Sequence, residues 1–153
     1  MLTRALIAFL ALPGMVAGVA PWLLAAIDPW RGFGAPFVGA ALYVAGMLMV
    51  AACAVQFYRA GRGTLAPWSP PKALVTGGLY RWTRNPMYVG VVIAVCGAGI
   101  AVGSPLVGLY AAVLAFLFHA RVIMHEEPWL ALRFPEEWRA YSIDTPRWLR
   151  WIS

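Results

Sequence analysis

Three long apolar runs, separated by short polar segments, dominate the pattern of this chain. Residues 5–27 and 32–58 contain no charged side chain, and residues 85–120 form a third uncharged run. A helix of about 20 residues crosses the hydrocarbon core of a bilayer, so each run is long enough to span it. The third run is broken by a Gly-Ser-Pro sequence at 103–105, which is typical of a tight turn between two helices.

The pattern predicts an all-α integral membrane protein of about four transmembrane helices in a single domain, residues 1–153. The expected spans are about 5–27, 34–58, 87–103 and 105–124, with a loop at 59–86 and a tail at 125–153. The first run has a second interpretation as a secretory signal peptide, because Arg4 precedes it and small residues occupy 16–20. We expect it to be an uncleaved helix.

Glycines spaced four residues apart occur at 14 and 18 and again at 99 and 103. This spacing allows two helices to approach closely in a membrane. We expect the contacts to form within the chain, and a dimer contact is the alternative.

The composition excludes a water-soluble globule. Of the 153 residues, 62% are hydrophobic and 12% are charged, whereas a soluble domain carries about 25% charged residues. A chain this apolar is also excluded from the disordered class.

The basic residues are distributed unevenly about the predicted spans. Twelve Lys and Arg residues outnumber six acidic residues. Eleven of the twelve lie in the termini, the central loop or the tail, and Arg31 alone lies on the other side. The positive-inside rule therefore predicts cytoplasmic termini and a cytoplasmic central loop. Nucleic acid is not an expected partner, because its binding needs a clustered basic surface.

The predicted spans carry little that could do chemistry. Cys53 and Cys96 lie inside apolar runs and are expected to be packing residues. His119 and His125 are six residues apart, on different faces of a helix, so no metal site is expected. A transporter would place ionisable groups inside its spans, which makes that class less favoured.

Polar residues concentrate in the predicted cytoplasmic stretches 59–88 and 121–153. A site built from both, at the membrane surface, would suit an enzyme that takes a lipophilic substrate from the bilayer and a polar one from the cytosol. The first stretch could instead be an interfacial loop with aromatic belt residues. Around Glu126 and Glu127, either the fourth helix continues into the cytosol or the carboxylates bind a cationic or hydroxylated ligand. The tail mixes Trp and Arg and fits a segment on the lipid headgroups.

These two stretches also carry a family pattern. Over residues 65–147 the sequence resembles the isoprenylcysteine carboxyl methyltransferase family and its wider relatives, which include phospholipid methyltransferases. The matching positions are Leu74, Val75, Thr76, Gly78, Tyr80, Arg81, Arg84, Asn85, Pro86, Tyr88, Gly90, Glu126, Glu127, Leu130, Phe134, Glu136, Glu137, Trp138, Tyr141, Pro146 and Arg147. Asn85 replaces the usual histidine of the family, and an asparagine does not titrate near neutral pH.

The resemblance implies S-adenosyl-L-methionine as the methyl donor, bound at the cytoplasmic face. By position, its contacts are expected at Lys72, Ala73, Leu74, Val75, Tyr80, Arg84, Asn85, Pro86, Met87, Tyr88 and Glu126. Arg121 is the candidate to face the substrate, although Val122 occupies the family's arginine position. Glu127 is the second catalytic candidate. An amine or thiol acceptor must be deprotonated before transfer, and His125 or a glutamate would have to serve as the base.

The predicted function is therefore methyl transfer to a lipophilic acceptor drawn from the lipid bilayer, as in the isoprenylcysteine carboxyl methyltransferases. A phospholipid amine or a small thiol is the alternative acceptor. A non-catalytic membrane protein that retains the fold is the alternative from another class.

Overall fold

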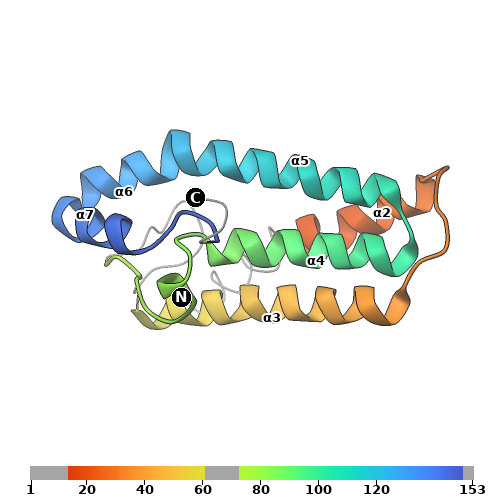
Figure 1. Ribbon diagram of the computed structural model, residues 1–153, viewed down its shortest axis with the longest axis horizontal. Helices are drawn as coiled ribbons and strands as arrows, with labels where there is room; N and C mark the ends of the chain where they lie inside the picture. Colours follow the sequence, from red (N-terminus) through yellow and green to blue (C-terminus); the bar gives the residue numbers. More distant parts are fainter. Residues whose placement is uncertain (1–13, 61–72, 150–153) are drawn as a thin grey trace.

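The computed structural model describes residues 14–60 and 73–149, and within these ranges the chain is helical with no strands, which confirms the all-α prediction. Figure 1 shows the helices aligned along one long axis. In chain order the elements are η1 (Met15–Val19), α2 (Ala20–Ile27), α3 (Pro36–Ala60), η2 (Gly78–Arg81), α4 (Pro86–Val102), α5 (Pro105–Arg121), η3 (Val122–Glu126), α6 (Glu127–Arg133) and α7 (Pro135–Asp144).

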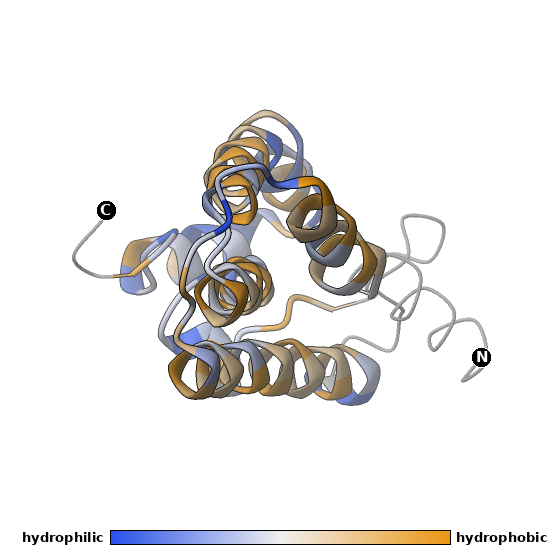
Figure 2. Ribbon diagram, turned by 90° about the vertical axis from the view of Figure 1, so that its right-hand side faces the viewer, coloured by the Kyte–Doolittle hydropathy of each residue, from blue (hydrophilic) through white to orange (hydrophobic). Residues whose placement is uncertain are grey.

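Two of the described helices are long and apolar enough to cross a membrane. They are Pro36–Arg59, with 24 residues, and Pro105–Arg133, with 29 residues, in which α5 continues through η3 into α6. The helices Met15–Ile27 and Pro86–Val102 are apolar but shorter. Viewed along the bundle, the helices carry many hydrophobic residues, drawn orange in Figure 2. Residues 5–13 of the first predicted span lie outside the described residues.

Helix α4 lies between α3 and α5 (Figure 1), and its contact with α3 is made through glycine. A Cβ added to Gly97 would lie 2.5 Å from the Tyr43 nitrogen, and one added to Gly46 would lie 2.5 Å from the Gly90 oxygen. A Cβ on Gly39 would also meet the backbone of α4, with the Gly97 oxygen at 2.5 Å. The two backbones are therefore in direct contact along a glycine seam, which consists of Gly39, Gly46, Gly90 and Gly97.

This seam differs from the glycine spacing singled out in the sequence. Among the described residues, a Cβ on Gly14 or Gly18 would meet nothing within 4 Å. Gly99 packs against α5, with the Val107 side chain at 3.3 Å from its added Cβ, so this contact forms within the chain as expected. Gly103 serves a turn instead.

The predicted turn at 103–105 is confirmed. Gly103 has φ 64°, a left-handed conformation that glycine adopts without a Cβ penalty. Ser104 then caps α5, because its side chain accepts a hydrogen bond from the Val107 N–H at 3.3 Å. Pro105 occupies the first turn of that helix, where its missing N–H costs nothing.

Asp28, which follows α2, ties this turn to the rest of the bundle. Its carboxylate accepts hydrogen bonds from the Ser104 hydroxyl, from the Leu106 N–H at 2.9 Å and from the Trp30 N–H at 2.9 Å. These hydrogen bonds, that of Ser104 foremost, hold the pKa of Asp28 below its ordinary value. The negative charge also lies at the N-terminus of α5, where the helix dipole favours an anion.

Because the pKa of Asp28 is depressed in the folded protein, its charged form contributes stability above the pKa of the unfolded chain, and protonation removes that stability as pH falls. We expect thermal unfolding in detergent to shift to lower temperature below about pH 4. In Asp28→Asn this acid-induced shift should be smaller, and the variant should be less stable than the parent at neutral pH. An equal acid shift in both proteins would contradict the assignment.

The buried residues form two clusters. The larger one lies between the helices and includes Val50, Val91, Val95 and Val107. The second cluster joins Cys53 of α3 to Val75 and Tyr80 of the loop before α4 and to Tyr141 of α7. Cys53 is fully buried and packs as predicted, and Cys96 is half-buried. The second cluster fastens the loop and α7 to the bundle beside the polar end of the molecule.

Candidate functional site

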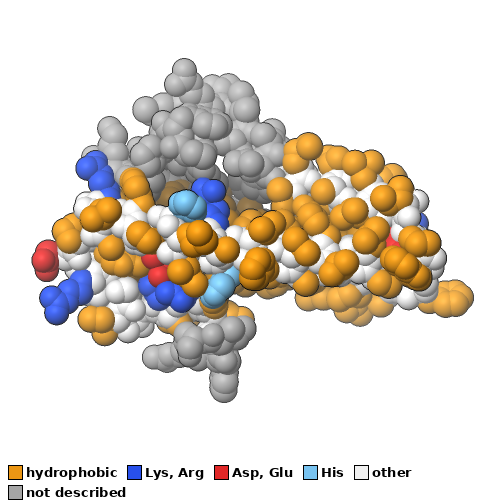
Figure 3. Space-filling model, turned by 90° about the horizontal axis from the view of Figure 1, so that it is seen from above, with side chains coloured by type: hydrophobic (Ala, Val, Ile, Leu, Met, Phe, Trp, Pro, Cys, Tyr) orange, Lys and Arg blue, Asp and Glu red, His pale blue; other side chains and the backbone are white. Residues whose placement is uncertain are grey.

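Most of the described charged side chains gather at one end of the molecule, while Asp28 and Arg31 lie at the other. Figure 3 shows basic, acidic and histidine side chains around the α6–α7 end, whereas apolar side chains cover the opposite half of the same face. Three segments meet at the polar end: the residues that precede and begin α4, the helical stretch from α5 to α6, and residues 145–149 after α7. The sequence prediction of a site built from the two polar stretches is consistent with this meeting.

A π-helical turn between α5 and α6 determines which side chains face α4. Arg121 and Glu126 are five residues apart, a spacing that in an α-helix would place them on different faces. The wider turn of η3 brings them together, and the Arg121 Nε donates to Glu126 Oε1 at 2.8 Å. Single π turns occur often at functional sites.

Tyr88, in the first turns of α4, completes this group. Its hydroxyl donates to Glu126 Oε1, and Arg121 Nε lies 3.2 Å from the same hydroxyl. The Tyr88 ring stacks on Phe118, with ring centroids 4.4 Å apart. Tyr88, Arg121 and Glu126 are called the Tyr88 cluster below. The Arg121 side chain is 56% exposed and that of Glu126 is 32% exposed, so the cluster is open to a ligand.

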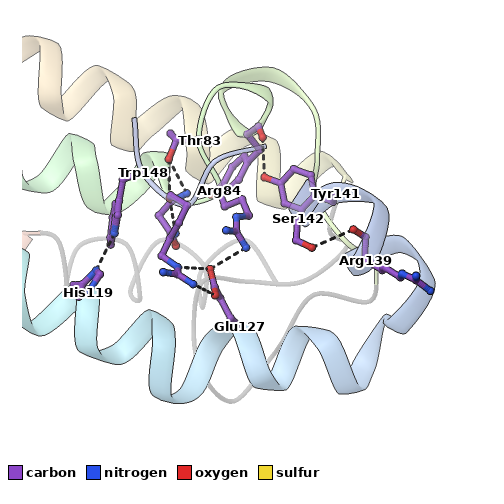
Figure 4. Close-up of polar contacts among 11 residues, drawn as sticks. Thr83, Arg84, His119, Glu127, Arg139, Tyr141, Ser142 and Trp148 are labelled. Atoms are coloured by element: carbon purple, nitrogen blue, oxygen red, sulfur yellow. Dashed lines mark hydrogen bonds and ion pairs between the residues drawn. The ribbon is translucent and has the colours of Figure 1, made fainter. Parts of the chain in front are cut away.

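The neighbouring Glu127 has a different environment. Arg147 donates from Nε and Nη2 to its two carboxylate oxygens, both at 2.8 Å, and Arg84 Nη1 lies 3.0 Å from Oε1. Figure 4 shows the Glu127 side chain directed from its helix toward Arg84. Glu127 is only 15% exposed, and its bidentate pair with Arg147 is a geometrically specific, charge-assisted contact. The guanidinium groups of Arg84 and Arg147 thus both bind the Glu127 carboxylate.

The pKa values of the two arginines shift in opposite directions. Burial lowers the pKa of Arg84 below its ordinary value, and the Glu127 carboxylate opposes that shift. Hydrogen bonding to Glu127 raises the pKa of Arg147. The Arg84 guanidinium also lies over the Trp138 ring, 5.3 Å from its centroid. Its Nε atom is buried and has no hydrogen-bond partner among the described residues.

Residues 145–148, called the C-terminal strap below, cross the start of α4. The Arg147 carbonyl accepts hydrogen bonds from Asn85 Nδ2 at 2.9 Å and from the Thr83 hydroxyl at 3.0 Å. The Arg84 N–H donates to the Pro146 carbonyl at 2.9 Å. The Trp148 indole N–H donates to His119 Nδ1 on α5 at 3.0 Å (Figure 4). The strap therefore links the loop, α5 and α6.

The residues of the loop before α4 are mostly packed. Val75 and Tyr80 are buried in the second cluster, and the Tyr141 hydroxyl donates to the Tyr80 carbonyl at 2.7 Å. Burial raises the pKa of both tyrosines above their ordinary value, so both hydroxyls are neutral at physiological pH. These contacts hold the loop against α7.

The predicted site residues thus fall into several environments. Glu126 and Tyr88 meet Arg121, whereas Glu127 meets Arg84. Asn85 and Pro86 are buried, Met87 is half-buried, Leu74 is half-buried and Ala73 is exposed, and Lys72 lies outside the described residues. Their roles toward a cofactor or substrate stay predictions. Of the two explanations for Glu126 and Glu127, helix continuation is confirmed, since the helix runs on to Arg133.

Two contacts at this end were not predicted from the sequence. One is made by Thr83, which lies inside the family pattern but outside its matching positions, and the other joins His119 and Trp148. Arg147 matched the pattern without an assigned role. The Pro-Arg at 146–147, which belongs to the family pattern, was the one sequence feature that pointed to the strap. Its hydrogen-bond partners could not be predicted, because no local signal connects residues more than 60 positions apart.

Comparison with protein families gives a match. A family model described as phospholipid methyltransferase matches residues 35–137, which is more than half of the chain. No curated protein matches the sequence. The matched range includes α3, α4, α5 and both glutamates, and with the two long apolar helices it indicates a membrane protein.

Proposed function

The chain belongs to the phospholipid methyltransferase family, and from that premise we propose that it is a membrane enzyme that transfers a methyl group from S-adenosyl-L-methionine to a lipophilic acceptor. The family points to methyltransferase activity. The observation that carries the proposal further is the position of the half-exposed Tyr88 cluster beside the uncapped start of α4. The charge asymmetry of the chain supports a cytoplasmic position for this end.

The start of α4 offers donors for the carboxylate of the methionine portion. No described side chain caps its first turn, and Pro86 lacks an N–H, which leaves the backbone N–H groups of Met87 and Tyr88 for a ligand. The buried Arg84 Nε, without a partner among the described residues, is a further donor near this helix end. A carboxylate would satisfy such donors, so the local chemistry fits the predicted cofactor.

Glu126 offers an acceptor for the rest of the cofactor. Its half-exposed carboxylate can accept hydrogen bonds from a ribose diol or from the methionine ammonium group. Tyr88 and Arg121 both donate to Oε1, which fixes the carboxylate while its second oxygen stays outside these two contacts. This arrangement favours a cofactor-binding role for Glu126.

Bound cofactor would supply an electrophilic methyl group on a sulfonium sulfur. The protein would then contribute mainly alignment of acceptor and methyl group and exclusion of water. Arg121 is the residue proposed to face the acceptor, because its guanidinium is exposed beyond its contacts with Glu126 and Tyr88. Glu127, held by two arginines, is better suited to position the strap than to exchange a proton with the acceptor.

The location of the site supports a lipophilic acceptor. The Tyr88 cluster lies where the uncharged part of α5 ends, a position at which a lipid would enter from the bilayer. We propose a lipophilic carboxylate as the acceptor, as in the isoprenylcysteine carboxyl methyltransferases, because neutralisation of charge during transfer is favoured in a dry site. A phospholipid amine or a small thiol is the alternative, and each would first have to lose a proton.

Calorimetry of the detergent-solubilised protein with S-adenosyl-L-methionine tests the proposal. We expect saturable binding, followed by transfer of a radiolabelled methyl group into an extract of host lipids. A protein that does not bind the cofactor would contradict the proposal and favour the non-catalytic alternative. Binding without transfer into any fraction would contradict the enzymatic part alone.

A further inference from the structure

The side chain of Asn85 does not cap α4, although Asn85 lies at the N-cap position of that helix. Asparagine at this position ordinarily accepts a hydrogen bond from an N–H of the first turn. Here it makes no cap, and Nδ2 instead donates to the Arg147 carbonyl at 2.9 Å. Asn85 is 9% exposed, so this contact is shielded from water.

Thr83 reinforces the same contact. Its hydroxyl accepts a hydrogen bond from the Asn85 N–H at 3.2 Å and donates to the Arg147 carbonyl at 3.0 Å. Thr83 is 1% exposed. Two buried side chains therefore donate to one carbonyl oxygen. The hydrogen bond from the Asn85 N–H orients the Thr83 hydroxyl so that it can donate to the Arg147 carbonyl.

The carbonyl belongs to the residue whose guanidinium holds Glu127. Once the Arg147 backbone is held at the start of α4, its side chain reaches both oxygens of Glu127 at 2.8 Å. Glu127 follows Glu126 directly at the π turn, and Arg84 adds a second ion pair to it. The strap thus connects the start of α4 to the helix that carries the Tyr88 cluster.

We propose that Asn85 is a positioning residue, which with Thr83 fastens the C-terminal strap and so holds the start of α4 and Glu126 in the arrangement that binds the cofactor. This inference rests on the proposed function. The residue that replaces the family histidine thereby acts through the strap and not on the reacting atoms. Its uncharged amide makes the fastening independent of pH near neutrality.

Hydrogen–deuterium exchange of residues 145–149, in detergent without cofactor, measures the fastening directly. We expect about 5-fold faster exchange in Asn85→Ala and in Thr83→Val, since each loses one hydrogen bond to the strap, and at least about 25-fold in the double variant. Ser142→Ala is the matched control, because it removes a hydroxyl that donates to a carbonyl, that of Arg139, within α7. The control should exchange like the parent.

Steady-state kinetics then measures the positioning role. We expect the KM for S-adenosyl-L-methionine to rise about 5-fold in each single variant, with kcat and the shape of the pH profile unchanged. Unchanged exchange in the variants, or faster exchange without a rise in KM, would overturn this inference alone. A parent protein that binds no cofactor would overturn the proposed function together with it. If Asn85→Ala does not fold, Thr83→Val supplies the same test from the second donor.

Discussion

Replacing Glu126 by alanine is expected to weaken S-adenosyl-L-methionine binding by about 10- to 100-fold, because a hydrogen bond to a charged group contributes about 1.5–3 kcal/mol. The fold should survive the change. The partner that loses its ion pair, Arg121, is 56% exposed and remains hydrated, and pairs this exposed contribute little to stability. Isothermal titration calorimetry of the purified protein measures the affinity, and circular dichroism reports the helical content.

Two further variants refine this expectation. Tyr88→Phe removes the hydroxyl that fixes Glu126 but retains the ring that stacks on Phe118, and should weaken binding by about 10-fold. Glu136→Gln is the matched control, since it neutralises an exposed carboxylate in the first turn of α7. If the Glu126 variant binds the cofactor as tightly as Glu136→Gln does, the assigned site is wrong.

The largest effect on stability is expected at the glycine seam. In Gly97→Ala the new Cβ would lie 2.5 Å from the Tyr43 nitrogen and 2.7 Å from the Gly39 oxygen, both backbone atoms of α3. No side-chain rotation can relieve these contacts, so the helices must separate. We expect a loss of about 3 kcal/mol, which lowers the Tm by about 10 °C for a chain of this length.

Gly108→Ala provides the same chemical change without the contact. An added Cβ at this position in α5 meets no described atom within 4 Å, and alanine favours a helix over glycine by up to about 1 kcal/mol. The variant should be as stable as the parent or more stable. Thermal unfolding followed by circular dichroism in one detergent compares the two, and equal Tm values for Gly97→Ala and Gly108→Ala would refute the close approach of α3 and α4.

The sequence by itself determined the helical class, the turn at 103–105 and the helices predicted at about 34–58, 87–103 and 105–124, which the structure has at 36–60, 86–102 and 105–121. These features are local: an uncharged run, a proline at a first turn and a glycine at a helix end act within a few residues. The segregation of charge to one end is local in the same sense, because basic residues flank the apolar runs. The family pattern added the expected cofactor contacts.

Only the tertiary structure decided which of two adjacent glutamates meets Tyr88 and which is held by arginines. Neighbouring residues on a helix point about 100° apart, and the π turn of η3 changes the phase between α5 and α6, so the direction of Glu126 depends on packing. The glycine seam and the strap likewise join residues about 45 to 60 positions apart. Their partners are selected by how the helices assemble, which no single stretch of the sequence encodes.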